Sequence, residues 1–412
     1  MTTTRRTVLG ALGVSVAATG ATLAGTGTAR AGTARAGTAG ATGAARATSG
    51  RVPPELRPGG ALDAFVAEEA AQGRFSGSVL LTHRGRQVLA RSHGMADRER
   101  SLPNGPDTLY SLASVTKLFT AVAVAQLAQR GEVGYQATVG TYLDGFPAEV
   151  ADRVTVHHLL THTSGLGDTF RMPGFAEESA TWDSVEEVMA GFGRYVRTDR
   201  PAFAPGAGFA YSNTGFHVLG EIVAAVAGRP YHDHVREHVF RAAGMTGSDF
   251  YTRTQWRDDR RIAHPYAVTE TGGREDVLEQ RLFVGTPAGD AFANCAGLDR
   301  FARALTGGEL LDPTFVGITL GGKVPPAGPQ RPPGDGDRPR RTMFQAYGPM
   351  ATLEAGQWTI GHNGGSRGIA TSVEVFPDTD WVAVVLANYD TPQGVMPSVP
   401  TKARELILAA GA

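Results

Sequence analysis

The chain has 412 residues, with 39 lysines and arginines against 40 aspartates and glutamates, so its formal net charge is −1. Such a balance argues against nucleic acid or an anionic membrane surface as the main partner, because those partners select for basic surfaces. The length and the 42% content of hydrophobic residues suffice for one large domain or two ordinary domains with a sizeable core.

The N-terminal segment contains no acidic residue before Glu55. Arg5 and Arg6 precede a modestly apolar stretch, and Ala29 and Ala31 flank Arg30 in a small-x-small pattern, which is the arrangement of a twin-arginine-type export signal. Glycines and threonines interrupt the apolar stretch, so we expect no stable transmembrane anchor. The same small-x-small pattern recurs downstream and leaves the cleavage position open. The predicted parts are a signal peptide over 1–31, a flexible low-complexity tether over 32–54 and a folded domain over 55–412 of a secreted or extracytoplasmic protein.

Strand patterns lie at both ends of the folded region, and helical periodicity dominates between them. The predicted elements, in chain order, are a helix over 61–72, a hairpin over 75–81 and 87–92, helices over 114–130, 157–161, 215–226, 231–240 and 298–305, strands over 357–361, 371–376 and 381–388, and a helix over 401–409. This order predicts an α+β fold, in which one antiparallel sheet is built from both chain ends (about 55–113 and 306–412) and a large, mostly helical insertion covers about 114–305.

A proline-rich stretch and a single cysteine lie in the second half of the chain. Residues 323–341 contain six prolines and predict a surface loop, which either overhangs a site or has no role in it. Cys295 is the only cysteine, so the chain can form no internal disulfide. Its neighbours include no histidine or other base, so we expect a buried small apolar residue and not a nucleophile.

Ser114 and Lys117 form a Ser-x-x-Lys motif at the start of a predicted apolar helix, and the chain has only three lysines. Residues i and i+3 of a helix share a face and are about 4.5 Å apart along its axis, so this lysine can reach the serine hydroxyl. A desolvated lysine can accept the proton of a serine nucleophile. The alternative, a helix cap beside a surface lysine, is less favoured because the residues after Lys117 are apolar.

Two more motifs follow in the chain. Tyr211 and Asn213 form Tyr-x-Asn, and His362, Asn363 and Gly364 lie on the strand predicted from 357 onward. Each motif alone is a weak signal, because a tyrosine near an asparagine often marks only a turn with a packed ring.

Together and in this order, the three motifs resemble the site elements of the serine β-lactamase, penicillin-binding protein and DD-peptidase superfamily. The sequence LLTHTSGL over 159–166 and the pair Gly244-Met245 favour its class C β-lactamase-related branch, which includes secreted D-alanyl-D-alanine carboxypeptidases and esterases. The resemblance covers about 62–388. It implies a beta-lactamase/transpeptidase-like fold and acyl transfer without a metal or other cofactor.

The resemblance also implies roles for the motif residues. Ser114 would be the acylated nucleophile, Lys117 would help to deprotonate it, and Tyr211 would act as general acid or base. Asn213 would hold Lys117 and the substrate amide. The oxyanion hole would consist of the backbone N–H groups of Ser114 and Gly365.

The strand motif departs from the usual family pattern. His362 would hydrogen-bond Tyr211, and histidine in place of lysine implies a peptidase or esterase more than an efficient β-lactamase. Asn363 replaces the hydroxyl residue that would contact a substrate carboxylate, and it forms the substrate-binding strand with His362 and Gly364. No Glu-x-x-Leu-Asn stretch is present, so the class A route of deacylation is not expected.

Two rival patterns carry less weight. Ser366 lies in a Gly-x-Ser-x-Gly sequence, but α/β-hydrolases need a histidine after that serine, and none follows His362. Two histidine pairs, His158 with His162 and His234 with His238, have i,i+4 spacing without the glutamate of a zinc-binding His-Glu-x-x-His motif. We therefore expect polar helix faces there and no metal site.

The sequence thus predicts an exported serine hydrolase that acts through an acyl-Ser114 intermediate, best matched to a D-alanyl-D-alanine carboxypeptidase. The alternatives are a β-lactamase-family esterase, a class C-like β-lactamase, and a penicillin-binding sensor without turnover. Its expected partners are small peptide, ester or β-lactam substrates, including cell-wall peptides, and its expected state is a monomer.

Overall fold

The structure is a computed structural model that describes residues 51–326, 341–390 and 398–411. The predicted signal peptide, nearly all of the predicted tether and most of the proline-rich loop lie outside these residues. Within the described ranges, no helix combines the length and apolar character needed to cross a membrane.

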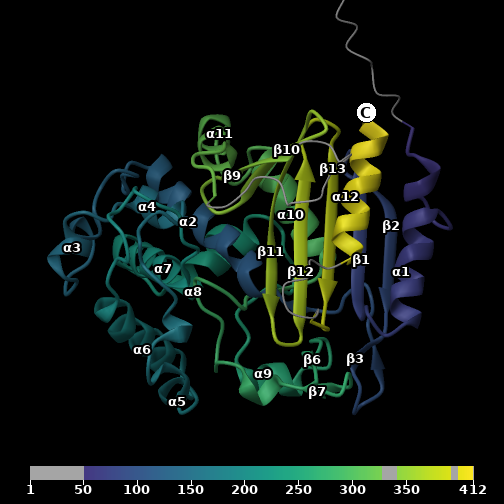
Figure 1. The fold of residues 1–412 in the computed structure, drawn as a ribbon, viewed down its shortest axis with the longest axis horizontal. Helices are drawn as coiled ribbons and strands as arrows, with labels where there is room; N and C mark the ends of the chain where they lie inside the picture. The colour runs from purple at the N-terminus through teal and green to yellow at the C-terminus, as the bar shows by residue number, and fades with distance from the viewer. Residues whose placement is uncertain (1–50, 327–340, 391–397, 412) are drawn as a thin grey trace, which may run out of the picture. The chain divides into compact units, whose positions relative to one another are not determined.

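The centre of the fold is a seven-stranded antiparallel sheet in the order β2-β1-β13-β12-β11-β10-β9 (Figure 1). Its strands are β1 (Gly77–His83), β2 (Arg86–His93), β9 (Arg341–Gln345), β10 (Met350–Glu354), β11 (Gln357–Ser366), β12 (Ile369–Phe376) and β13 (Trp381–Ala387). β1 from the N-terminal part pairs with β13 from the C-terminal part, with Gly77 opposite Ala387. The prediction that both chain ends build one sheet is confirmed.

The remaining elements flank the sheet or form the helical part. The helices are α1 (Ala61–Ala71), α2 (Lys117–Gln129), α3 (Ala148–Ala151), α4 (Val156–Leu160), α5 (Phe175–Ser179), α6 (Val185–Thr198), α7 (Asn213–Ala227), α8 (Tyr231–Val235), α9 (Arg253–Asp258), α10 (Cys295–Thr306), α11 (Pro313–Leu320) and α12 (Ser398–Gly411). The short strands are β3 (Met95–Asp97), β4 (Leu102–Pro103), β5 (Tyr110–Ser111), β6 (Tyr266–Val268), β7 (Arg274–Asp276) and β8 (Phe292–Ala293). The 3₁₀ turns are η1 (Pro54–Leu56), η2 (Ala113–Thr116), η3 (Val139–Thr141), η4 (Thr169–Arg171) and η6 (Leu278–Gln280), and η5 (Arg236–Arg241) is a π-helical segment.

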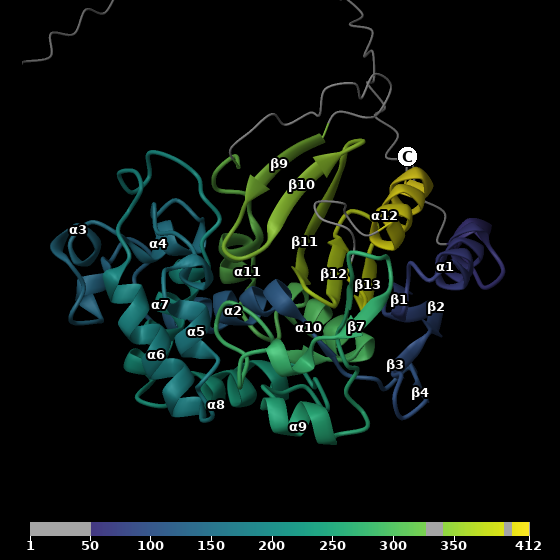
Figure 2. The same ribbon diagram turned by 60° about the horizontal axis from the view of Figure 1, so that its bottom comes forward.

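Helices cover both faces of the sheet. α12 lies across one face beside α1, where apolar side chains such as Leu62, Val385 and Ile407 form one core (Figures 1 and 2). α10 packs on β1 and β13 from the other face, within the larger core that continues into the helical part. Cys295 begins α10 and is a free, buried thiol, as predicted.

The helical part is organised around α2, which packs on α7, α8 and α11. Nearly every residue of α2 is buried, in keeping with a helix that is apolar on all sides. Close by, β5 pairs with β8 and Leu112 N donates to Ala291 O at 2.8 Å, so the chain leading to Ser114 lies against residues 289–293.

Several element boundaries differ from the predictions. The helix expected over 114–130 begins only at Lys117, and Ser114 belongs to the preceding turn η2. The helix expected over 231–240 divides into α8 and η5. The sequence patterns did not predict α3, α5, α6, α9, α11, β9, β10 or the short strands β3 to β8, and all of these except α6 have eight residues or fewer.

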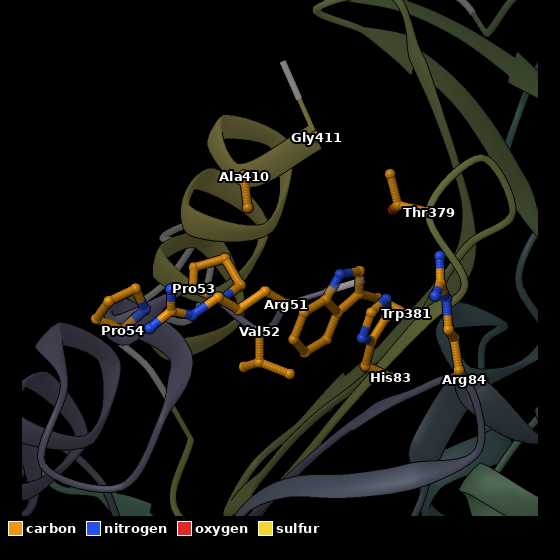
Figure 3. A pocket seen from close by; sticks show the side chains of 10 residues that line it. All are labelled: Arg51, Val52, Pro53, Pro54, His83, Arg84, Thr379, Trp381, Ala410 and Gly411. Carbon is orange, nitrogen blue, oxygen red and sulfur yellow. The ribbon is translucent and has the colours of Figure 1, made fainter. Parts of the chain in front are cut away.

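A cavity of about 390 Å³ lies beside the described ends of the chain, away from the predicted site (Figure 3). The rings of His83 and Trp381 stack there, with centroids 4.4 Å apart. Arg51, Arg84 and Gly411 also line it. None of the predicted catalytic residues contributes to this cavity.

Candidate active site

Ser114 lies in the 3₁₀ turn η2, directly before α2. In such a turn residues i and i+3 are eclipsed, and Lys117 Nζ lies 3.3 Å from Ser114 Oγ. Ala113 has a φ of +43°, in the left-handed region that residues with a side chain rarely adopt. Thr116 stabilises this turn, because its hydroxyl donates to Ala113 O at 2.7 Å and accepts from Ala291 N at 3.0 Å. These two hydrogen bonds thus stabilise the strained backbone at Ala113, immediately before Ser114.

Lys117 is completely buried, and its amine has three partners. Besides Ser114 Oγ, Nζ donates to Asn213 Oδ1 at 2.7 Å and to Ala288 O at 2.6 Å. Burial lowers the pKa of Lys117 to about 7, although the negative charges of Asp168 and Asp290 oppose this shift. Near neutral pH a substantial fraction of the amine is therefore unprotonated and able to accept the Ser114 proton.

Tyr211 stands just before α7 and faces the same amine. Lys117 Nζ is 4.9 Å from the centroid of the Tyr211 ring. Although 45% of the residue is exposed, desolvation of its phenol raises the Tyr211 pKa to about 12, and the nearby Ser114 hydroxyl partly opposes the rise. Tyr211 is consequently a neutral phenol at physiological pH, suited to donating a proton to a leaving group.

His162, from the LLTHTSGL sequence, supports Tyr211 from behind. Its ring lies 4.5 Å from the Tyr211 ring, and its Nδ1 accepts from Ser212 N at 3.1 Å. Burial holds the pKa of His162 well below its ordinary value, so the imidazole is neutral. Its φ of +58° places it beyond the end of α4. His158 and His162 therefore do not share a helix face.

His362 lies on β11, but its contacts differ from those expected. Its Nδ1 is 2.6 Å from Asn363 O, and burial lowers its pKa to about 4, with the charge of Lys117 adding to the effect. The predicted hydrogen bond between His362 and Tyr211 is absent from the described part of the chain, where Nδ1 of His362 pairs with the adjacent carbonyl. Asn363 pairs with Ser372 in the β11–β12 ladder.

Gly364 lets β11 pass against the nucleophile turn. A Cβ at this position would overlap Leu112 O and Thr371 Oγ1 and lie 3.1 Å from Ser114 N. A Cβ at Gly365, by contrast, would meet open space. The close approach at Gly364 places Gly365 in the wall of the same cleft as Ser114, where their two N–H groups can receive an oxyanion.

The cleft in front of Ser114 has a volume of about 480 Å³. Phe170, Phe175 and Leu282 give it an apolar wall, and Arg253 and Arg281 are the cationic side chains that line it. Arg281 Nη2 already contacts Asp290 Oδ2 at 3.1 Å and Ser366 Oγ at 2.8 Å. The site can therefore accept a substrate that has both apolar and polar groups.

Three contributors were not predicted from the sequence: Asp168, Ala288 and Asp290. Asn213 Nδ2 donates to Asp168 Oδ1 at 3.0 Å, and Asp290 accepts from Ser111 Oγ at 2.8 Å. A backbone carbonyl such as Ala288 O has no sequence signature. Asp168 directly follows the LLTHTSGL segment and a glycine, and this proximity was the only available signal.

The residues of the rival patterns lie in other local settings. Ser366 lies at the end of β11, in the hairpin to β12, and not at a strand-to-helix turn. The rings of His234 and His238 are 4.5 Å apart, but the described residues contain no group of three or more His, Cys, Asp or Glu side chains arranged to hold a metal ion.

Comparisons with known proteins identify relatives of this chain. A profile of the Beta-lactamase family matches residues 62–407. Penicillin-binding protein 4* of Bacillus subtilis is 33% identical over 254 residues, which cover 56% of this chain and 52% of that protein. Esterase EstB of Burkholderia gladioli is 34% identical over 249 residues, covering 56% and 61%. The matches therefore span between half and three fifths of the length of these relatives.

Solved structures show the same fold. A penicillin-binding protein from Bacillus halodurans superposes with a TM-score of 0.71 at 25% identity and covers 83% of this chain and 98% of its own. A D-amino acid amidase from Ochrobactrum anthropi, in complex with L-phenylalanine amide, reaches a TM-score of 0.69 at 24% identity and covers 85% and 97%. The latter likeness concerns the fold alone.

Proposed function

Because the chain belongs to the beta-lactamase family, we propose that it is an exported serine hydrolase, a D-alanyl-D-alanine carboxypeptidase-like enzyme that forms an acyl-Ser114 intermediate. The observation that carries this proposal is the buried Lys117 amine, 3.3 Å from Ser114 Oγ and with a pKa lowered to about 7. It supplies a base where the nucleophile needs one.

Acylation follows from these positions. The neutral Lys117 amine accepts the hydroxyl proton while Ser114 Oγ attacks the substrate carbonyl, and the oxyanion is received by the N–H groups of Ser114 and Gly365. Tyr211 passes a proton to the departing amine as the C–N bond breaks, and it recovers one from the ammonium of Lys117. In deacylation, water attacks the ester with proton transfers in the reverse direction, which releases the acid and restores Ser114.

Three observations agree with a cell-wall peptidase, and the first of them argues against an efficient β-lactamase. His362 replaces lysine, a difference that the family resemblance connects with peptidases and esterases. A Bacillus subtilis relative bears the name of a penicillin-binding protein. The N-terminal sequence carries the features of an export signal, as an enzyme acting on cell-wall peptides requires.

A second candidate is an esterase of the same family. It is favoured by the 34% identity to esterase EstB and by Asn363, which lacks the hydroxyl expected to bind a substrate carboxylate. Both candidates use the same acyl-Ser114 chemistry, so the leaving group alone distinguishes them.

The decisive experiment exposes the wild type and Ser114→Ala to a fluorescent penicillin and follows both by intact mass. We expect a covalent adduct on the wild type and none on the variant. Release of D-alanine from a peptide ending in D-alanyl-D-alanine identifies the carboxypeptidase, and turnover of p-nitrophenyl acetate alone identifies the esterase. Rapid loss of the adduct identifies a β-lactamase, and a stable adduct without any turnover identifies a sensor. A wild type that forms no adduct and cleaves no ester, amide or lactam would refute the proposal.

Export has a separate test. Replacing both Arg5 and Arg6 with lysine keeps the charge of the segment but removes the paired arginines that mark the twin-arginine type. We expect the protein with this change to remain in the cytoplasmic fraction, whereas the unmodified chain leaves it. Equal export of both proteins would contradict a twin-arginine route.

A further inference from the structure

Asp168 lies in the wall of the cleft and meets the catalytic groups through the Asn213 amide. Asn213 Nδ2 donates to Asp168 Oδ1 at 3.0 Å, while Asn213 Oδ1 accepts from Lys117 Nζ at 2.7 Å. An ionised carboxylate only accepts hydrogen bonds, so the amide nitrogen must face Asp168 and the amide oxygen must face Lys117. The reversed amide would set its NH₂ group against the amine and its oxygen against the carboxylate.

The segment that carries Asp168 is fixed in register against the start of α7. Ser212 Oγ donates to Gly167 O at 2.8 Å, and the hydroxyls of Thr169 and Thr214 are 2.8 Å apart. With the contact between Asp168 and Asn213, three successive residues of one segment meet three successive residues of the other. This pairing sets the position of the carboxylate independently of any substrate.

Asp168 also acts on the Lys117 amine through its negative charge. The ionisable groups that act on this amine, or on which it acts, are the carboxylates of Asp168 and Asp290, the phenol of Tyr211 and the imidazoles of His162, His217 and His362. All three imidazoles have pKa values lowered by burial, so they are neutral above acidic pH.

The two carboxylates differ in how far other cations neutralise them. Asp290 forms an ion pair with Arg281, whose side chain is largely buried. Among the described residues, Asp168 forms a longer ion pair with Arg171, in which Oδ2 lies 3.6 Å from Nε. The side chain of Arg171 is 88% exposed. Solvent screens an exposed partner strongly, so more of the Asp168 charge acts on Lys117.

We propose that Asp168 is a positioning residue for acylation, which orients the Asn213 amide toward Lys117 and stabilises the ammonium that forms when Lys117 accepts the Ser114 proton. This inference rests on the function proposed above. The carboxylate acts through Asn213 and through its charge, without touching the nucleophile. In a buried site a fixed charge of this kind favours the state in which charge develops.

The test uses Asp168→Asn and Asp168→Ala, with Asp152→Asn at an exposed position as the matched control. Values of kcat and KM are measured from pH 5 to 10 with p-nitrophenyl acetate, whose uncharged acyl group cannot form an ion pair with Asp168. Asp168→Asn keeps an oxygen that accepts from Asn213 and removes the charge. Asp168→Ala removes both.

We expect Asp168→Asn to shift the rising limb of kcat/KM toward lower pH by about one unit, because the charge that favours protonated Lys117 is lost. Asp168→Ala should also lower kcat by roughly tenfold to a hundredfold, with KM within about twofold, because the amide loses its fixed orientation. Asp152→Asn should match the wild type in every parameter.

Three results would overturn the inference. In the first, both Asp168 variants match the control. In the second, KM rises while kcat is kept, which would assign Asp168 to substrate binding. In the third, thermal stability falls while the pH profile stays in place, which would give Asp168 a structural role only, through contacts such as the one with Phe170 N at the start of η4. If Asp168→Ala does not fold, the pH profile of Asp168→Asn decides. Failure of the proposed function is recognised separately, by a wild type that forms no penicillin adduct.

Discussion

Lys117 is fully buried and Lys323 is partly buried, yet the surroundings of these two lysines differ. Lys117 is the first residue of α2, at the N-terminal end of the helix, where the helix dipole disfavours a positive charge. Lys323 follows the end of α11 and donates to Ile318 O and Gly321 O, both at 2.6 Å, where carbonyl groups favour a positive charge. Burial lowers the pKa of both amines, but only Lys117 has a serine hydroxyl within reach. A lowered lysine pKa therefore indicates a catalytic base only when a nucleophile lies beside it.

The largest expected effect is on activity. Lys117→Ala should lower the rate of Ser114 acylation by about a thousandfold, the usual contribution of a positioned base, whereas Lys323→Ala should change it less than twofold. Stopped-flow measurement with a fluorescent penicillin compares the two variants, with circular dichroism to confirm folding. Comparable losses in both variants would break the distinction drawn between these lysines.

The next effect is on stability. Replacing Lys117 lowers activity, but it should raise the free energy of unfolding. The unfolded chain keeps Lys117 protonated up to about its ordinary pKa, whereas the folded protein releases this proton above about pH 7. The unfolded state thus binds more protons than the folded state between these two pH values, so Lys117 makes the free energy of unfolding rise with pH in this range. Below pH 7 the burial of the charged amine lowers the free energy of unfolding by on the order of 4 kcal/mol.

Lys117→Met should remove this pH dependence and raise the free energy of unfolding at pH 7 by roughly 1–3 kcal/mol, after the lost hydrogen bonds are counted. Urea unfolding at pH 7 and pH 9.5 measures both quantities. A variant that retains the wild-type slope between these pH values would show that Lys117 does not carry a lowered pKa in the folded protein.

Adjacent glycines on β11 give a matched pair with a smaller effect. Gly364→Ala would force β11 away from Leu112 and Ser114, so we expect kcat/KM to fall by about a hundredfold. Gly365→Ala has space for its methyl group and should keep most of the activity. Equal behaviour of the two variants in an ester hydrolysis assay would argue against the close passage of β11 beside the nucleophile.

The smallest effect concerns Lys323. Its contacts with carbonyl groups at the end of α11 are those of a helix-terminal cation, so Lys323→Ala should lower the free energy of unfolding by about 1 kcal/mol. Thermal unfolding detects such a change. A loss several times larger would mean that Lys323 has a wider structural role than its contacts indicate.

The sequence predicted the parts of the molecule that depend on local spacing. Ser114 and Lys117 are one turn apart, so their contact follows from helix geometry, and the alternating strands near both ends predicted β1, β2 and the β11–β13 meander. Tyr211 and Asn213 could be placed in the site only through the family resemblance, because they are remote from Ser114 in the chain.

The remaining features depend on tertiary contacts that no local pattern records. Asp168 meets Asn213 across 45 residues, and Lys117 meets Ala288 O across 171. The left-handed backbone of Ala113 is imposed by its neighbours and not by its own residue type. His362 was correctly assigned to the strand; the contact of its ring with Asn363 O is local, but it depends on the side-chain rotamer, which no sequence pattern records.

The central claim is that Lys117 activates Ser114 because its pKa is lowered to about 7. The most direct test is the pH dependence of the acylation rate of wild-type protein between pH 5 and 10. The site has no competing group at that pH, since burial moves the pKa of His362 to about 4 and that of Tyr211 to about 12. The account predicts a rate that rises to a plateau with a midpoint near pH 7 and loses this midpoint in Lys117→Ala. A midpoint near pH 10, or the same midpoint in the variant, would contradict it.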